Sequence, residues 1–547
     1  MSKIKIFALG GQNEIGKNMY VVEVDKKIYI FDAGLKYADD KLLGVDYIIP
    51  NYDYLKNNKD RIVGIFITHG HDEQIGAIDD ILVDLPNVKI YAGKFTLEII
   101  KQNMEADGIK KANLIEIQAH KKIDFKTESI FPIQVSHDIP DSYLYVLNTK
   151  DGAICFSGNY VFDPLMMGPY NTDIGKLAYI GKQNVLCLLN ESIYANKVGY
   201  TSPQHHATSF IRNILESNPK RIFFNIFENQ IYRIQELFNE ITKSNRSIVI
   251  MGKDLENIIF KSIDLGYIKF DKEKIRPINH VNDEGIIVII SNEREKPYSS
   301  LKRILRNSDK FVTLNEEDTV VILSPLYEGT EVTSTKVFNK IAKLGAKLEV
   351  LSKKCLSLHS SSEDIMMMIN LLQPKYYFPI MGEYRHQVEN SLLAKKLNYT
   401  DDNILLKLNG EVAYFVDGKL TESNEVIKVD DVLIDGKTIG DIGDLVLKDR
   451  EMLSDSGIVI VNANIDKQTR NIINKPNIVT KGFIYVKDNI DMLKEAENII
   501  SDVILENIKD NYIDYNNLKV SIRDRLGKYF YKETESKPMI IIIIQEI

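Results

Sequence analysis

The segment Ile67-Thr68-His69-Gly70-His71-Asp72-Glu73-Gln74-Ile75-Gly76 decides the fold of this chain. It closes an apolar run, residues 62–67, whose pattern predicts a buried strand. A strand that ends in a loop with two histidines, separated by a single residue, can direct both imidazoles at one metal ion. The segment therefore predicts a metal-binding loop, with His69 and His71 as its first candidate ligands.

The composition sets limits on the class of protein. Hydrophobic residues make up 44% and charged residues 27% of the 547 residues, the balance of a soluble globular protein with several domains. The net charge of −8 argues against nucleic acid coating the whole surface, but it allows RNA in a locally basic groove. Without a signal-peptide core or a membrane-length apolar run, we expect a cytoplasmic protein with no membrane partner. The separated Cys155, Cys187 and Cys355 are typical of buried thiols in a reducing compartment.

The order of predicted elements indicates an α/β chain. The first two hundred residues alternate short β-branched runs with turns and helical patterns, among them helices predicted at residues 72–85 and 96–106, which favours a sheet sandwich covered by helices. Residues 202–282 are richer in helix, with recurring strands, and predict a parallel-sheet insert. Residues 457–547 predict strand, strand, long helix, helix, strand. The run Ile540–Ile544 is expected to form a terminal strand buried on both faces.

Further segments, spread along the chain, carry a family pattern. They are Leu9–Met19, Phe31–Leu35, Leu43–Asp46, His137–Ser142, Pro379–Arg385 and Lys481–Val486. In this order, together with the histidine loop, they resemble the ribonuclease J family of bacterial metallo-β-lactamase/β-CASP RNA nucleases. The resemblance implies a metallo-β-lactamase αββα sandwich, an inserted β-CASP α/β domain and a small α+β C-terminal domain. It assigns the lactamase domain to residues 1–205 and 351–430, the β-CASP domain to 206–350, a linker to 431–456 and a C-terminal dimerisation domain to 457–547.

The resemblance also implies the ligand positions of a dinuclear metal site. The three that hold histidine all belong to the first metal, and they are His69, His71 and His137. The bridging position holds Asn159, and the second metal's positions hold Glu73, Gln74 and Met381. Amide and thioether groups are weak zinc ligands, and a glutamate in place of aspartate misplaces its carboxylate by one methylene. We therefore expect at most one zinc ion per chain, with manganese or magnesium as alternatives.

A second loop corresponds to the family's phosphate-binding segment. It spans Ser357–Asp364, and the resemblance implies that Ser357, His359, Ser360 and Ser361 bind RNA phosphate. His359 and Glu73 are the catalytic candidates. A helix should begin near Ser361 or Ser362 and end before Pro374, so ordinary helix capping is the simpler explanation of these serines. In the same way, the histidines can form a structural pair without a metal, and Asp32 is expected to hydrogen-bond the metal loop in either case.

Three functional hypotheses remain open at this point. The favoured one is a ribonuclease J-like protein of RNA processing and decay, a catalytically weakened or inactive subunit that binds RNA and partners an active paralogue, as a homodimer or heteromer. The alternative is an active metal-dependent 5′-to-3′ exoribonuclease or endoribonuclease of mRNA decay and rRNA maturation, because a three-histidine zinc can still activate water. The third is a small-molecule lactamase-fold hydrolase such as a thioesterase, against which the insert and the C-terminal unit argue. A second gene copy with intact ligands in the same genome would favour the first hypothesis.

Overall fold

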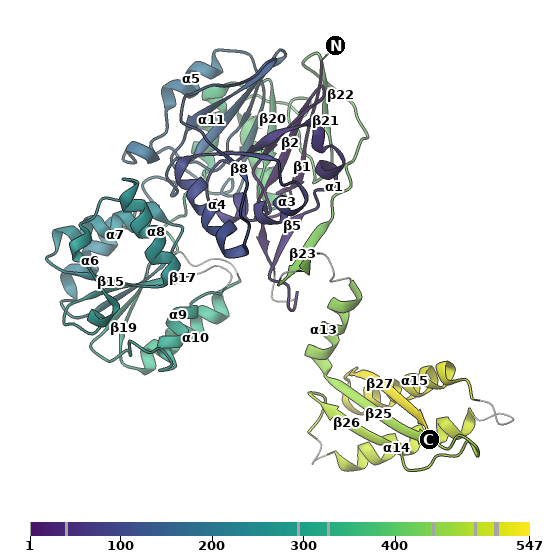
Figure 1. Cartoon of the computed structure of the whole chain (residues 1–547). Helices are drawn as coiled ribbons and strands as arrows, with labels where there is room; N and C mark the ends of the chain where they lie inside the picture. Colours follow the sequence, from purple (N-terminus) through teal and green to yellow (C-terminus); the bar gives the residue numbers. More distant parts are fainter. Residues whose placement is uncertain are drawn as a thin grey trace. The chain divides into compact units, whose positions relative to one another are not determined.

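The computed structural model describes residues 2–38, 42–292, 296–324, 329–436, 438–439, 444–485, 489–507 and 513–547, so Val486 of the last family segment lies outside it. The chain divides into two compact units. The larger comprises residues 1–37 and 46–432, and the smaller comprises residues 38–45 and 433–547 (Figure 1). Within the described residues, no helix is both long and apolar enough to cross a bilayer.

Two facing sheets form the centre of the larger unit. The first contains β1 (Lys3–Gly10), β2 (Met19–Val24), β3 (Lys27–Phe31), β6 (Ile62–Phe66), β7 (Lys89–Ala92), β8 (Asn113–Glu116), β21 (Ala413–Val416) and β22 (Lys419–Thr421), in the order β22-β21-β1-β2-β3-β6-β7-β8. The second contains β9 (Ile123–Phe125), β10 (Glu128–Gln134), β11 (Tyr143–Thr149), β12 (Gly152–Phe156), β13 (Val185–Glu191) and β20 (Tyr376–Ile380), in the order β20-β13-β12-β11-β10-β9. Alternate residues of both sheets, such as Ile4 and Ile6 of β1 and Tyr145 and Leu147 of β11, share one core.

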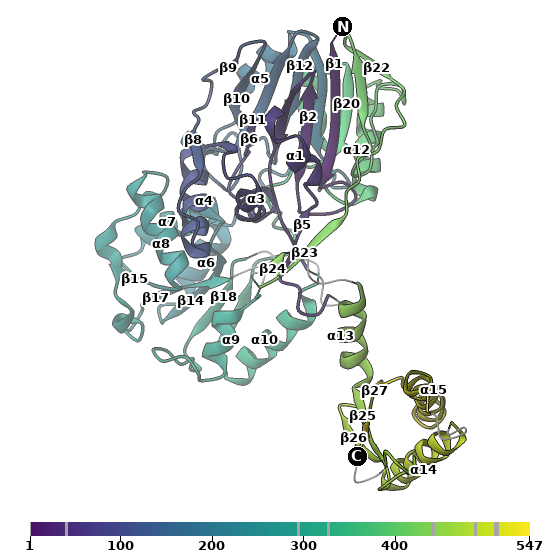
Figure 2. The same cartoon turned by 45° about the vertical axis from the view of Figure 1, so that its right-hand side comes forward.

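Helices cover the outer faces of this sandwich. On the second sheet, α5 (Ile174–Gly181), α11 (Ser362–Leu372) and α12 (Tyr384–Lys396) bury their apolar residues against β10 to β13. The first sheet is covered by α1 (Asp53–Asn57), α3 (Ile78–Asp84) and α4 (Lys94–Asp107) (Figure 2). Tyr54 of α1 packs edge-on against Phe7 of β1. The predicted αββα sandwich and the helix at 96–106 are thereby confirmed.

The helix predicted over residues 72–85 is wrong, because it is broken. The structure has a short α2 (Asp72–Ile75) and then α3, with Gly76 and Ala77 between them. Instead of continuing a helix, the carbonyls of Glu73 and Gln74 accept hydrogen bonds from the backbone N–H groups of Asn18 and Ala33. The loop approaches so closely that a Cβ at Gly34 would lie 1.6 Å from the Glu73 carbonyl oxygen. The break fixes the histidine loop to the strands behind it.

The inserted domain is a parallel sheet with helices on both faces, as predicted. Its strands are β14 (Ile222–Phe227), β15 (Ile248–Met251), β16 (Ile275–Arg276), β17 (Ile287–Asn292), β18 (Thr319–Ile322) and β19 (Lys347–Val350), in the order β16-β15-β17-β14-β18-β19 with every pair parallel. One face carries α6 (Thr208–Ser217), α7 (Ile231–Lys243) and α8 (Lys253–Asp264). The other carries α9 (Ser299–Leu305) and α10 (Glu331–Lys343) (Figure 2).

The smaller unit shows the predicted order of β25 (Ile458–Ile465), β26 (Asn477–Lys481), α14 (Ile490–Glu506), α15 (Tyr515–Thr534) and β27 (Met539–Glu546). It also contains α13 (Asp444–Ser456), within the segment assigned as linker. The sheet order is β26-β25-β27, and both α14 and α15 pack on one face (Figure 2). The prediction that residues 540–544 are buried on both faces is therefore wrong. Ile540 and Ile542 are 7% exposed, but Ile541 and Ile543 are each 41% exposed, since helices cover a single face.

Candidate metal and phosphate site

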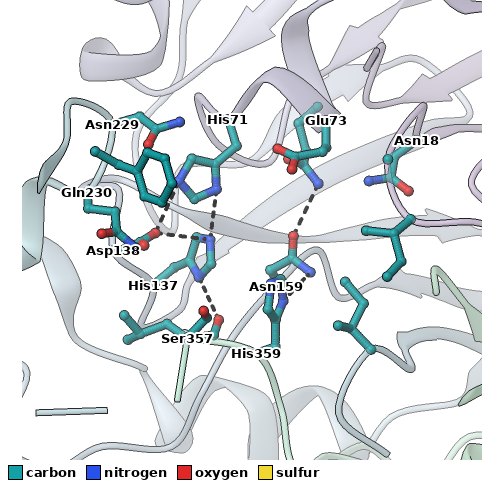
Figure 3. A pocket seen from close by; sticks show the side chains of 16 residues that line it. Asn18, His71, Glu73, His137, Asp138, Asn159, Asn229, Gln230, Ser357 and His359 are labelled. Atoms are coloured by element: carbon teal, nitrogen blue, oxygen red, sulfur yellow. Dashed lines mark hydrogen bonds and ion pairs between the residues drawn. The ribbon is translucent and has the colours of Figure 1, made fainter. Parts of the chain in front are cut away.

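Three histidine rings meet at one end of the sandwich. His69 and His71 come from the loop after β6, and His137 comes from the loop between β10 and β11. Nδ1 of His71 lies 3.1 Å from Nε2 of His69. It also lies 3.2 Å from Nε2 of His137 (Figure 3). His69 and His137 are buried, and His71 is half-buried. The structure thus brings together the three histidines that the sequence predicted as ligands of one metal.

Each of the three rings also has an outer nitrogen, the one that faces away from the other two rings. Each outer nitrogen lies near an oxygen atom, and this neighbour indicates where the proton sits. Nδ1 of His137 lies 2.9 Å from the carbonyl oxygen of Leu358, which can only accept, so this nitrogen carries the proton. Nδ1 of His69 lies 2.9 Å from Oγ1 of Thr68, and Nε2 of His71 lies 3.2 Å from Oδ1 of Asp138. Protons on these outer nitrogens leave three lone pairs facing one another. A cation relieves that arrangement, and outer-nitrogen hydrogen bonds of this kind are how proteins orient histidine ligands.

The charge states of the neighbours fit a cation site. Burial lowers the pKa of His137 to about 4 and also lowers the pKa of His69, so both rings are neutral at pH 7. Burial acts to raise the pKa of Asp138, but the neighbouring His71 ring outweighs this effect and holds the pKa of Asp138 well below its usual range. Asp138 is therefore a buried anion beside the lone pairs, 3.2 Å from His71 and 3.3 Å from His137. The residues present fit one divalent metal ion.

Asp32 supports this loop as the sequence predicted. Its buried carboxylate accepts hydrogen bonds from the backbone N–H of Thr68 at 2.8 Å and from the Thr68 hydroxyl at 3.0 Å. Thr68 Oγ1 donates its proton to Asp32, so a lone pair of the same hydroxyl oxygen can accept the Nδ1 proton of His69. Asp32 therefore orients His69 through Thr68.

The positions implied for a second metal are joined to one another instead. The Gln74 side chain donates from Nε2 to Oδ1 of Asn159 at 3.1 Å (Figure 3). Nδ2 of Asn159 in turn donates to Oε2 of Glu191 at 2.7 Å. Met381 is 1% exposed, belongs to the core between the two sheets and places its sulfur 3.5 Å from Asn159. Two neutral amides and a thioether form a poor donor set for a hard or borderline dication. These residues do not fit a second metal.

Glu191, at the end of β13, is a site residue that the sequence analysis missed. Its buried carboxylate accepts from the backbone N–H groups of Tyr160 and Ser360, each at 3.0 Å, and lies 3.1 Å from Nδ1 of His359. Burial acts to raise the pKa of Glu191, but the contacts from His359, Tyr160 and Asn159 hold it below its usual value. A glutamate that closes a strand of mostly apolar residues, 185–191, was the available signal. Asp138 was also missed, although it adjoins His137.

The predicted phosphate-binding residues separate into two groups. Ser357 and His359 line a cavity of about 70 Å³ together with His71, His137 and Asn159 (Figure 3). Ser360 and Ser361 are fully buried and are not among the lining residues. Ser360 Oγ donates to the Tyr160 carbonyl, and Ser361 is the N-cap of α11. Glu73 and Gln74 also line the cavity. As drawn, the cavity has room for a few water molecules but not for a nucleotide.

Known proteins match the chain along its whole length. Residues 13–128 match the profile of the metallo-beta-lactamase superfamily, residues 219–341 that of the ribonuclease J beta-CASP domain, and residues 445–547 that of the ribonuclease J C-terminal domain. Ribonuclease J2 of Bacillus subtilis (strain 168) is 34% identical over 549 residues, with 100% of this chain and 99% of that protein covered. Ribonuclease J 2 of Staphylococcus aureus (strain NCTC 8325 / PS 47) is 33% identical over 549 residues, with coverages of 100% and 98%.

A solved structure supports the fold alone. The crystal structure of a protein of unknown function from Enterococcus faecalis V583 superimposes with a TM-score of 0.54 at 14% identity, and the match covers 76% of this chain and all of that one. The full-length sequence relatives carry the stronger conclusion. With its lactamase sandwich, β-CASP insert and C-terminal domain, this chain belongs to the ribonuclease J family.

Proposed function

We propose that this chain is a catalytically weakened or inactive ribonuclease J subunit that holds one metal ion, binds RNA and assembles with an active paralogue. The observation that carries the proposal is the hydrogen bond from Gln74 to Asn159. Two-metal hydrolases hold their ions about 3.5–4 Å apart with anionic ligands between them. Here the bridging position is a neutral amide that is already bonded on both sides.

One metal on His69, His71 and His137 would polarise a phosphate oxygen as a Lewis acid. The chain's own residues position the substrate. Because Glu191 keeps the proton on Nδ1 of His359, Nε2 of His359 is the basic nitrogen and can accept a proton or a hydrogen bond beside the cavity. Without a second cation, a water molecule in the cavity lacks one of the two charges that would lower its pKa and orient it. Hydrolysis should therefore be slow.

Binding of RNA requires less of the site than cleavage does. Contacts to phosphate and to unstacked bases need no metal. Ser357 and His359 remain at the cavity, where lactamase loops meet Asn229 and Gln230 of the β-CASP domain (Figure 3). A chain that retains these groups and a complete C-terminal domain keeps the parts that a cytoplasmic RNA-binding subunit uses. Either a homodimer or a heteromer with an active copy is consistent with this role.

A second candidate function is active cleavage, as a 5′-to-3′ exoribonuclease or an endoribonuclease. It is favoured by the three converging lone pairs and the Asp138 anion beside them, since three-histidine sites support hydrolysis in other proteins. The manganese-dependent or magnesium-dependent turnover of 5′-monophosphorylated RNA separates the two candidates. Slow or undetectable turnover supports the weakened subunit. Robust turnover that His71→Ala abolishes supports the active enzyme.

A further inference from the structure

A second cluster of metal-ligating side chains lies outside the site described above and shares no residue with it. Asp163 follows β12 in the lactamase domain, and His205 and His206 lie in the segment that enters the β-CASP domain before α6. Nε2 of His205 lies 2.5 Å, and Nε2 of His206 2.9 Å, from the same carboxylate oxygen, Oδ2 of Asp163. Asp163 and His205 are fully buried, and the His206 side chain is 18% exposed.

Hydrogen bonding alone leaves this cluster incomplete. Among the described residues, the buried Nδ1 of His205 finds no hydrogen-bond partner. Nε2 of His206 approaches Asp163 closely but also lacks a partner with hydrogen-bond geometry. Buried polar atoms without partners are costly, and they often mark a position where an ion or a water molecule binds. Both rings converge on one anionic oxygen, so a cation bound there would be shared by Asp163 and the two histidines in place of their direct contacts.

The donor set selects the class of cation. One atom each from Asp163, His205 and His206 lies within 4.8 Å of the others, so the three side chains are near enough to share one ion. Two imidazoles and a carboxylate suit zinc and not magnesium or calcium, which prefer oxygen ligands. Glu236 of α7 lies 3.3 Å from Nδ1 of His206, the outer carboxylate that commonly orients a histidine ligand.

The cluster is accessible from one side. His206, Glu236, Thr208, Arg212 and Tyr232 line an open cavity of about 440 Å³ on the β-CASP side. This cavity gives an ion a route to the cluster and leaves room for a water molecule as fourth ligand. The opposite side is closed by protein, because the His205 carbonyl accepts hydrogen bonds from Arg233 of α7 and from the thiol of Cys355.

We propose that Asp163, His205 and His206 form a zinc site that clamps the lactamase domain to the β-CASP domain where the chain passes between them. The ligands come from both sides of this crossing, and Cys355 belongs to the segment that returns from the insert. Helix α7, which supplies Arg233 and Glu236 to the cluster, begins directly after Asn229 and Gln230 of the RNA-site cavity. An ion at the clamp would therefore fix the β-CASP wall of that cavity. It would raise the expected total to two ions per chain, one in each cluster.

The test uses the full-length chain with the first cluster removed by His69→Ala, His71→Ala and His137→Ala. After chelation, reloading with zinc chloride and desalting, elemental analysis should find about one zinc per chain in this triple variant. Adding His206→Gln should remove that zinc and abolish the rise in Tm that zinc produces. The matched control is His280→Gln, because His280 pairs with Asp283 on the exposed surface of the same domain. It should leave both readouts unchanged.

Two results would overturn the clamp. One is a folded triple variant that holds no zinc, and the other is zinc that stays bound after His206→Gln. If the triple variant fails to fold, the same measurement on the otherwise unaltered chain decides. His206→Gln must then lower the zinc content from about two per chain to about one, and an unchanged content rejects the proposal. Failure here leaves the proposed RNA role intact, since that role rests on the cavity lined by Ser357 and His359 and not on the second cluster.

Discussion

Nε2 of Gln74 lies 3.1 Å from Oδ1 of Asn159, and this hydrogen bond occupies the place where the family pattern expects a metal-bridging carboxylate and a second-metal histidine. It is one link in a chain of contacts that continues through Glu191 to His359. These contacts satisfy the hydrogen bonding of buried polar groups that would otherwise require a cation. In the proposed one-metal site, these contacts take the place of a second ion, and the sandwich keeps its architecture.

Restoring the missing ligands should restore chemistry. The combined variant Glu73→Asp, Gln74→His, Asn159→Asp and Met381→His is expected to raise manganese-dependent cleavage of 5′-monophosphorylated RNA by at least about 10–100-fold, the usual effect of repairing a metal environment. Asn159→Asp alone is the matched control. It places a carboxylate at the position of the amide that now donates to Glu191 at 2.7 Å, so it should lower Tm without raising turnover. A four-residue variant that binds two metals yet stays inactive would show that the RNA path, not the metal site, limits activity.

RNA binding should outlast catalysis. Fluorescence anisotropy with single-stranded RNA is expected to give a Kd that removal of the first-cluster metal by His69→Ala leaves unchanged. The Kd should rise steeply with salt, with a slope of about 0.7 per contacted phosphate on a double-logarithmic plot. His359→Ala should weaken binding, because His359 lines the cavity, whereas His280→Ala should not. Absence of binding at low salt would leave a purely structural role.

Assembly should depend on the C-terminal unit. Removing the chain after about residue 450 is expected to yield monomers with an intact lactamase core, as measured by light scattering at low micromolar concentration. The double variant Ile541→Lys, Ile543→Lys should also yield monomers. Both residues lie on the exposed side of β27, opposite the face that packs on α14 and α15. Val520→Lys, on the exposed surface of α15, is the control. A truncated chain that remains dimeric would place the main interface elsewhere.

The free energy of unfolding should fall as the pH rises from about 4 to about 7, because of one cluster of acidic residues around Asp79. Burial and the neighbouring Asp107 and Asp80 raise the pKa of Asp79 to about 7. An aspartate with a raised folded-state pKa favours folding while it is protonated, so its contribution is complete below pH 4 and is lost as the pH rises through 7. Asp79→Asn should therefore stabilise the protein at pH 8 by on the order of 1 kcal/mol and have little effect at pH 4. Urea unfolding at both pH values, with the exposed Asp124→Asn as control, makes the comparison. Equal effects of Asp79→Asn at both pH values would contradict it.

Much of the fold and part of the site could be predicted from the sequence. The histidine loop and its support by Asp32 were predictable because strand ends and ligand spacing are local features. The break after Ile75 was not, since it depends on hydrogen bonds to Asn18 and Ala33 from distant strands. The sequence around Ser360 and Ser361 resembled a phosphate-binding loop. Their burial, however, depends on the packing of the end of β13 against the start of α11, which the sequence does not show. Glu191 and Asp163 were missed because a single acidic residue is a weak sequence signal until the fold places histidines beside it.

The central claim is that the lactamase site holds one metal ion and not two. Anomalous diffraction from crystals grown with zinc tests it most directly, because each ion is located and not merely counted. The account predicts a single peak among His69, His71 and His137, with no second peak beside Gln74 and Asn159. Two peaks about 3.5–4 Å apart at that place would contradict it.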